Sequence, residues 1–286
     1  MDAPQIIFDR ALCRERLSRA LLRGAADFLF ETAVDECLAR ISAVNRTFSA
    51  ALDLASPLPG LAASLAQQGS LVFRAAPVCG GRDNLVADVE ALPFSAGAFD
   101  LIASLLALQT ANDLPGALAQ IRRCLQPDGL FIGCLLGGRS LYELRAAFTE
   151  AEVDLTGGAS PRVAPLADVR DVGRLLQRAG FALPVADSEP VTVRYDSMFG
   201  LIADLRAMGA TNPLVARARA PLARAVLHRA AQLYAARFAD SDGRVRATFE
   251  MVWMSGWGPH PSQQKPLKPG SAQVRLADAL ASRAKA

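Results

Sequence analysis

Short apolar runs alternate with longer helical stretches from about residue 48 onward, and this alternation restricts the fold more than any other feature of the sequence. Short runs bounded by turn residues are typical of strands, and strands separated by helical patterns favour a parallel sheet wrapped by helices. We therefore expect an α/β, doubly wound, mostly parallel sheet with helices on both faces. The expected strands are 48–54, 70–75, 84–87, 99–106 and 129–136.

Apolar residues spaced by three or four positions predict helices on both sides of these strands. Gly24 divides the helical pattern between Asp9 and about Val44 into two helices, and Pro127-Asp128-Gly129 is expected to end a later helix. Two strand candidates, 182–187 and 190–195, predict a late hairpin-like addition, and a last strand is expected at 244–257. The other expected helices are 61–68, 114–125, 140–153 and 168–179.

The same patterns predict three parts along the chain. An N-terminal helical cap is expected at 1–44 and the α/β domain at 45–258, with a helical insertion at about 197–239. A Pro-rich tail with a short helix follows at 259–286.

Composition excludes several classes of protein. The net charge of +3 comes from 31 basic and 28 acidic residues spread along the chain, so no nucleic-acid-binding surface stands out. The five cysteines form no C-x-x-C pair, which argues against a disulfide framework or a zinc site and favours a reducing cytoplasm. Neither a signal peptide nor a membrane span is expected. The first helix presents a basic face that is either solvated or meets an acidic partner; its arginines are Arg10, Arg14, Arg16, Arg19 and Arg23.

Three linked segments carry a resemblance. "ALDL" at 51–54, "ADVEALPFSAGAFDLIAS" at 87–104 and "ALAQIRRCLQPDGLFIGCLLGG" at 117–138 resemble class I S-adenosylmethionine-dependent methyltransferases. That resemblance implies a Rossmann-like methyltransferase sheet and S-adenosylmethionine as cofactor. "FDRALCRERLSRA", "DLRAMGATN" and "QQKPLKPGSAQVRLADAL" resemble the branch that contains the complex I assembly arginine hydroxylase and is similar to malonyl-carrier-protein methyltransferases. A respiratory complex I subunit is the partner that this branch implies.

The loop after the first strand departs from the resembled family. There the strand leads into a glycine-rich turn, because the backbone approaches the cofactor closely and adopts conformations that a β-carbon disfavours. In this sequence Ala55, Pro57 and Pro59 replace the three glycines, and Gly60 comes one position late. A proline has no N–H and restricts the residue before it, so we expect a stiff loop where the methionine part of the cofactor would lie.

The other cofactor positions are partly kept. Ala75 or Ala76 stands where the family has an acidic ribose acceptor. Asp88-Val89 resembles the pair that recognises adenine, although Asp88 equally suits a turn cap, and Asp53 either supports the cofactor or caps its loop. The cofactor-binding residues predicted by the resemblance are Asp53, Ala55, Gly60, Asp88, Val89 and Leu105.

No catalytic residue is identified by the sequence. Neither histidine, His228 or His260, stands in a catalytic pattern, and Gln109, Thr110 and Ala111 stand where the resembled branch has an aromatic residue and a histidine. We therefore expect a methyltransferase-fold protein with a degenerate cofactor site, related to complex I assembly and non-catalytic or weakly cofactor-binding. The alternative is an active methyltransferase, or an S-adenosylmethionine-binding arginine hydroxylase, with an altered loop.

Overall fold

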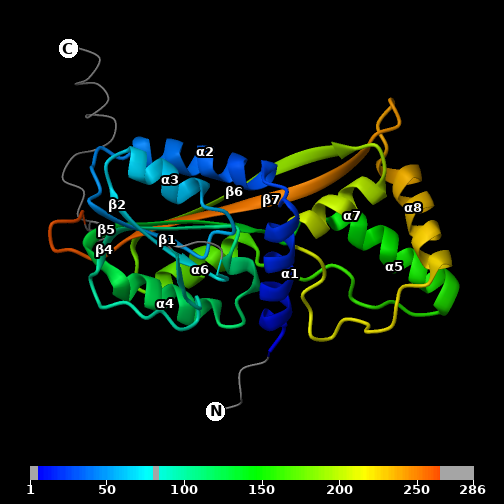
Figure 1. Ribbon diagram of the computed structural model, residues 1–286, viewed down its shortest axis with the longest axis horizontal. Coiled ribbons are helices and arrows are strands. Elements are labelled where there is room, and N and C mark those ends of the chain that lie inside the picture. Colours follow the sequence, from blue (N-terminus) through cyan, green and yellow to red (C-terminus); the bar gives the residue numbers. More distant parts are fainter. Residues whose placement is uncertain (1–5, 80–83, 265–286) are drawn as a thin grey trace, which may run out of the picture.

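The computed structural model describes residues 6–79 and 84–264, and these form a central seven-stranded sheet flanked by helices (Figure 1). The strand order is β3-β2-β1-β4-β5-β7-β6. The strands are β1 (Ala50–Leu54), β2 (Leu71–Ala76), β3 (Asn84–Val86), β4 (Phe99–Leu105), β5 (Leu125–Leu136), β6 (Ala182–Tyr195) and β7 (Val245–Trp257). The helices are α1 (Arg10–Arg23), α2 (Phe28–Ser42), α3 (Gly60–Gln67), η1 (Leu108–Thr110, a 3₁₀ turn), α4 (Leu114–Cys124), α5 (Tyr142–Thr156), α6 (Val169–Arg178), α7 (Met198–Ala207) and α8 (Arg224–Phe238).

Strands β1 to β5 are parallel, and β7 is antiparallel to both of its neighbours, β5 and β6. Strand β1 lies between β2 and β4, so the order of the sheet reverses there. In doubly wound sheets, ligands bind beyond the carboxyl ends of the strands at such a reversal. The predicted mostly parallel, Rossmann-like methyltransferase sheet is confirmed.

Two apolar cores lie on opposite faces of this sheet. Alternate residues of β4 belong to different cores, Leu101 to the first and Ile102 to the second, because successive side chains of a strand point to opposite faces. Helices α2 and α3 pack in the first core and α4 and α6 in the second, and Figure 1 shows these pairs above and below the sheet. The predicted covering of both faces is therefore observed.

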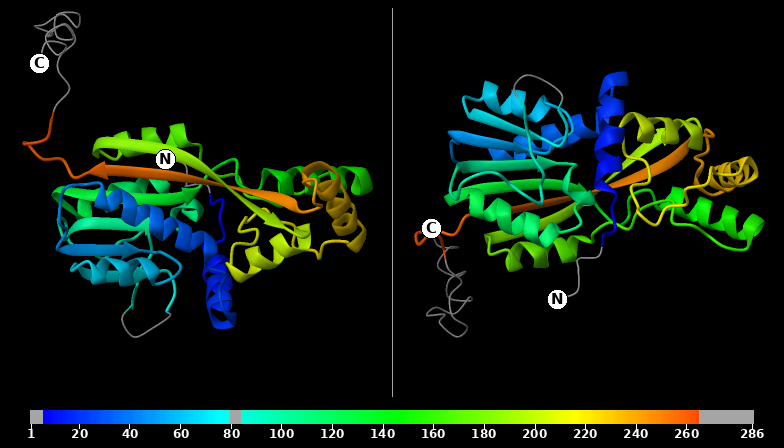
Figure 2. Two further views of the ribbon diagram at one scale, coloured as in Figure 1. Left: turned by 90° about the horizontal axis from the view of Figure 1, so that it is seen from above. Right: turned by 60° about the horizontal axis from the view of Figure 1, so that its bottom comes forward.

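The remaining helices extend the molecule past the sheet. Figures 1 and 2 show α5, α7 and α8 grouped beside the end of β6 and the start of β7, with α1 between this group and the parallel strands. In α8, Val226, Ala230 and Leu233 belong to the first core, which therefore continues from the sheet into this helical group. Within the described residues, no helix is both long and apolar enough to cross a membrane.

The predicted hairpin-like addition is wrong in detail. In place of two short strands, the structure has the single 14-residue strand β6, which pairs along its length with β7. Pro190 does not interrupt β6 because an edge strand leaves alternate N–H groups outside the sheet, where a proline is tolerated. Near its start, Leu183 has a φ of +48° and the register with β7 shifts between Ala182 and Val185.

The predicted stop at Pro127-Asp128-Gly129 also differs. Helix α4 does end nearby, at Cys124, but the next residue already begins β5, so the three residues lie inside a strand. Asp128 has a φ of +61°, and the register between β4 and β5 shifts at this point. Turn-forming residues are therefore used here for a bulge rather than for a loop. The 3₁₀ turn η1 was not predicted, and the short helix predicted in the tail lies outside the described residues.

Candidate functional site

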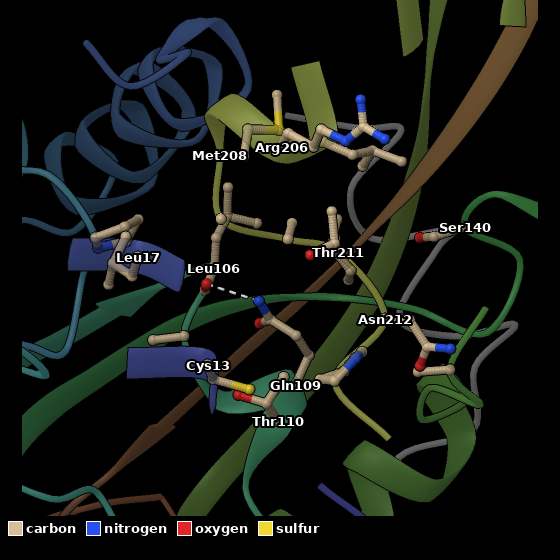
Figure 3. A pocket seen from close by; sticks show the side chains of 18 of the residues that line it. Cys13, Leu17, Leu106, Gln109, Thr110, Ser140, Arg206, Met208, Thr211 and Asn212 are labelled. Atoms are coloured by element: carbon tan, nitrogen blue, oxygen red, sulfur yellow. Dashed lines mark hydrogen bonds between the residues drawn. The ribbon is translucent and has the colours of Figure 1, made fainter. Parts of the chain in front are cut away.

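A cavity of about 840 Å³ lies at the carboxyl ends of the parallel strands, where the strand order reverses. Its walls come from the loops after β1, β3 and β4, from α1, and from the segment that follows α7. Figure 3 shows Arg206 and Met208 on one side of this cavity and Cys13, Gln109 and Thr110 on the opposite side. Because ligands of doubly wound sheets bind at this position, the cavity is the candidate functional site.

The turn after β1 keeps the backbone shape of a glycine turn without the glycine. Ala55 has a φ of +59°, in the left-handed region that favours glycine, and its N–H donates to the carbonyl oxygen of Ala75 at 2.7 Å. Ser56 is buried, and its Oγ accepts the N–H of Leu105 at 3.3 Å. Holding an alanine in this conformation costs about 1 kcal/mol. The loop is thus fixed to β2 and β4 in a strained form.

Two prolines continue this loop. Pro57 lines the cavity, and Pro59 directly precedes α3, whose first residue is Gly60. Since neither proline has an N–H, the entry to α3 presents fewer backbone donors than a glycine-rich turn would. Gly60 does not line the cavity, and a β-carbon there would meet only Phe30 Cε1, at 3.5 Å. No close approach to a ligand requires a glycine at this position.

Asp53, at the end of β1, is fully buried and faces a cation from the next strand. The Nε atom of Arg74 lies 3.4 Å from its Oδ2, and no residue in the described ranges donates a hydrogen bond to either carboxylate oxygen. Burial raises the pKa of Asp53 to about 6, although Ser56 and Arg74 lower it. The second guanidinium nitrogen of Arg74 donates to the carbonyl oxygen of Ser56 at 2.9 Å. Arg74 therefore joins the strand-end aspartate to the strained loop.

The end of β2 carries no acid that faces the cavity. Ala75 packs in the second apolar core, whereas Ala76, the next residue, faces the other side of the sheet, the side of Arg74. Both are buried and neither lines the cavity, but the adjacent Pro77 does. Of the two positions aligned with the ribose acceptor, Ala76 is thus the one on the same face of the sheet as Asp53 and Arg74.

Asp88, the carboxylate predicted to recognise adenine, forms ion pairs with arginines of α1. Arg10 donates to Asp88 at 2.6 Å and to Glu90 at 2.9 Å, and Arg14 lies 3.8 Å from Asp88. The Asp88 side chain also accepts the N–H of Glu90, which is the turn-capping role considered for it. Although burial raises it, this backbone hydrogen bond and the two guanidinium groups hold the pKa of Asp88 below its usual value.

The basic face of α1 is therefore largely bound within the chain. Beyond the pairing of Arg10, the guanidinium group of Arg16 donates to the carbonyl oxygens of Thr211 and Asn212 at 2.9 and 2.6 Å. The segment just before the helix is fixed as well, since Asn112 accepts the N–H groups of Ile7 and Phe8. The face was predicted to be solvated or to meet a partner. Arg14, Arg19 and Arg23 are exposed, as a solvated face requires, whereas Arg10 and Arg14 also line the cavity.

We predict that Arg10→Ala lowers the free energy of unfolding by about 1 kcal/mol, because it removes partly screened ion pairs to two carboxylates at once. Chemical denaturation checks this value. Arg19→Ala is the matched control on the same helix, since Arg19 pairs with the exposed Glu15 one turn away and with no other acidic residue that the structure describes. We expect a change below about 0.5 kcal/mol. Equal losses in both variants would contradict a specific role of Arg10 in holding α1.

The acceptor side of the cavity offers little acid–base chemistry. Gln109 and Thr110 line it, and Gln109 donates to the carbonyl oxygen of Leu106 at 2.7 Å, the contact dashed in Figure 3. Burial raises the pKa of the Cys13 thiol, which keeps it protonated at neutral pH. Both histidines are exposed and outside the cavity lining, and His260 contacts Ser262.

The structure separates the predicted cofactor residues into two groups. Ala55, Asp88 and Val89 line the cavity. Asp53, Gly60 and Leu105 lie behind its wall, although Asp53 and Leu105 are tied to the loop through Arg74 and Ser56. The described residues contain no group of three or more potential metal ligands. Sequence reasoning did not predict that Arg10 pairs with Asp88 or that Arg74 faces Asp53, because both contacts join distant segments, and it did not identify Arg206 as a cavity residue.

Comparison with known proteins agrees with this geometry. A methyltransferase domain family matches residues 51–133. The mitochondrial arginine-hydroxylase NDUFAF5 of Danio rerio is 38% identical over 287 residues, covering 95% of this chain and 89% of the relative. The human protein of the same name is 37% identical over 286 residues, with 95% and 83% covered. A malonyl-[acyl-carrier protein] O-methyltransferase of Gallionella capsiferriformans is 36% identical over 188 residues, with 66% and 60% covered.

The two arginine-hydroxylases match the chain over nearly its whole length, and the family match falls on the parallel strands that form the cavity. The chain therefore belongs to the arginine-hydroxylase NDUFAF5 branch of the class I S-adenosylmethionine-dependent methyltransferase superfamily.

Proposed function

We propose that this chain uses the methyltransferase fold as a protein-binding scaffold, with a degenerate S-adenosylmethionine site that binds the cofactor weakly or not at all. The observation that carries the proposal is the loop after β1. Its cavity-facing residues are Ala55, held at a φ of +59°, Pro57 and Leu58. Side chains fill the space where a glycine turn would bring backbone N–H groups to the cofactor.

The charges around the loop support the same proposal. Asp53 has Arg74 at 3.4 Å, and Asp88 has Arg10 at 2.6 Å, so both retained aspartates already face cations of the chain. At the end of β2, Ala76 supplies no acceptor for ribose hydroxyls. A cofactor that carries an adenosine and a cationic sulfonium would have to displace Arg10, and among residues 6–79 and 84–264 the cavity wall offers its ribose no carboxylate without an arginine partner.

The partner in this proposal is a respiratory complex I subunit, as the resemblance to the complex I assembly branch implies. In this role the chain acts by binding a subunit during assembly rather than by transferring a methyl group.

An active enzyme is the second candidate, favoured by the preserved cavity. It keeps about 840 Å³ of space, and Asp88 and Val89 still line it. In this alternative Arg10 moves aside when the cofactor binds, and the chain is a methyltransferase or an S-adenosylmethionine-binding arginine hydroxylase.

Titration calorimetry with S-adenosylmethionine and S-adenosylhomocysteine separates the two candidates. We expect no measurable heat up to about millimolar ligand, which corresponds to a binding free energy weaker than roughly −4 kcal/mol, and no thermal stabilisation. Micromolar binding of either compound would contradict the degenerate site and favour the enzyme.

A further inference from the structure

We propose that the cavity binds an amphipathic anion, an aliphatic chain with a negatively charged head group, in place of a sulfonium cofactor. The inference rests on the proposed function, because it assumes that S-adenosylmethionine does not occupy the cavity. Three observations support the inference: the charges that line the cavity, the apolar residues beside them, and Arg206, which pairs with no carboxylate of the described residues.

The charged lining is strongly asymmetric. Among the residues that the structure describes, the cavity wall contains one acidic side chain, Asp88, and four arginines, which are Arg10, Arg14, Arg162 and Arg206. Arg10 pairs with Asp88 and Glu90, and Arg162 pairs with Glu152 behind the wall. Even after these pairs the positive groups are in excess, so the wall attracts an anion and disfavours a cation.

Arg206 is the guanidinium group available to a ligand. It lies in the last turn of α7, is exposed, and forms no ion pair with any residue in the ranges 6–79 and 84–264. Figure 3 shows it at the side of the cavity opposite Gln109 and Thr110. A guanidinium group in this position offers paired N–H donors to a carboxylate, sulfate or phosphate head group.

The rest of the wall suits an aliphatic chain. Leu29, Phe30, Leu144, Phe148 and Leu205 all line the cavity, and each also belongs to the first apolar core. The cavity thus continues from the arginine side into the apolar interior. A linear chain with one charged end matches this arrangement, because burying the chain is favourable while its head group stays beside Arg206.

Three twelve-carbon probes of equal chain length test the charge requirement. Laurate and dodecyltrimethylammonium, below their micellar concentrations, and dodecanol, below its solubility limit, are titrated against the full chain. The chain is preloaded with a fluorescent anionic reporter, 8-anilinonaphthalene-1-sulfonate. We expect laurate to displace the reporter about tenfold more effectively than dodecanol, because one charge-assisted contact contributes about that factor. Dodecyltrimethylammonium should be weaker still.

Two variants and a control assign the site. Arg206→Gln should weaken laurate binding about tenfold and leave dodecanol binding unchanged, because only the head-group contact is lost. Thr211→Trp should weaken both, since Thr211 lines the cavity and a larger side chain fills it. Arg174→Gln is the control; Arg174 lies on α6, is 78% exposed and does not line the cavity, so laurate binding should not change.

The outcomes distinguish this inference from the proposed function. Equal binding of the three probes, or laurate binding that survives both Arg206→Gln and Thr211→Trp, would overturn the anion site. Absence of laurate binding together with absence of cofactor binding would overturn the anion site alone. Micromolar binding of S-adenosylmethionine would contradict the degenerate cofactor site. If laurate then failed to displace it, the anion site would be overturned as well, because both ligands are assigned to the same cavity.

Discussion

Glycine at positions 55, 57 and 59 together with aspartate at position 76 should raise the affinity for S-adenosylmethionine by about a hundredfold. The aspartate supplies a charged acceptor for the ribose hydroxyls, which is worth about 1.5–3 kcal/mol, or about 10- to 100-fold in affinity. Glycine in place of the two prolines adds backbone N–H groups, and the changes at Ala55 and Pro57 remove side chains that line the cavity. Position 76 is chosen because Ala75 packs in the second core, where a carboxylate would have no polar partner.

Calorimetry on the folded quadruple variant measures this gain. The matched control carries the same three glycines with Ala76→Asn, because asparagine has the shape of aspartate but no charge. Its affinity should rise only by the part that the glycines contribute. Glycine in place of each proline costs roughly 0.5–1 kcal/mol of stability through chain entropy, and Ala55→Gly relieves strain, so the variant should stay folded. If its affinity equals that of the unmodified chain, the loop does not limit cofactor binding.

The sheet could be predicted because its signals are local. Each parallel strand is a short apolar run between helical segments, and the observed bounds of β1, β2 and β4 lie within two residues of those predicted. Strand β6 and the start of β5 were mispredicted because Pro190 and Pro127-Asp128-Gly129 carry turn chemistry that the sheet absorbs at an edge and at a bulge. The sequence shows the turn-forming residues, but it does not show that a neighbouring strand pairs with the chain on both sides of them.

Only part of the candidate site could be predicted from the sequence, for a related reason. The loss of glycine at Ala55 and the retention of Asp88 are visible in the sequence, because they lie within one segment of the resembled pattern. That Arg10 would reach Asp88, or that Arg74 would reach Asp53, depends on where α1 docks and on the register of β2 against β1. No local sequence pattern specifies the docking of α1 or the register of β2. The arginines that pair with the two aspartates could therefore be identified only in the structure.

The buried pair of Asp53 and Arg74 leads to a prediction about stability against pH. The pKa of Asp53 is about 6 in the folded chain, above the ordinary value of 3.8, so the folded chain binds the proton more tightly than the unfolded chain does. Well below pH 3.8 the carboxyl is protonated in both states and contributes no difference. Between about pH 4 and pH 6 the unfolded chain ionises while the folded chain keeps its proton, so the folded chain loses about 3 kcal/mol of stability, and the loss is complete above pH 6.

Asp53→Asn should remove this contribution, because the amide has a similar shape and does not ionise. Chemical denaturation of both proteins between pH 4 and pH 7.5 measures it, and the difference between the two stability curves should change by about 2.5 kcal/mol across that range. Only the change is diagnostic, since any difference between the protonated carboxyl and the amide beside Arg74 shifts the variant equally at every pH. The surface carboxylates Asp9, Asp88 and Asp128, whose pKa values are lowered, act in the opposite direction but equally in both proteins, so they cancel. Parallel curves would mean that Asp53 stays ionised down to pH 4 and that Arg74 fully compensates its burial.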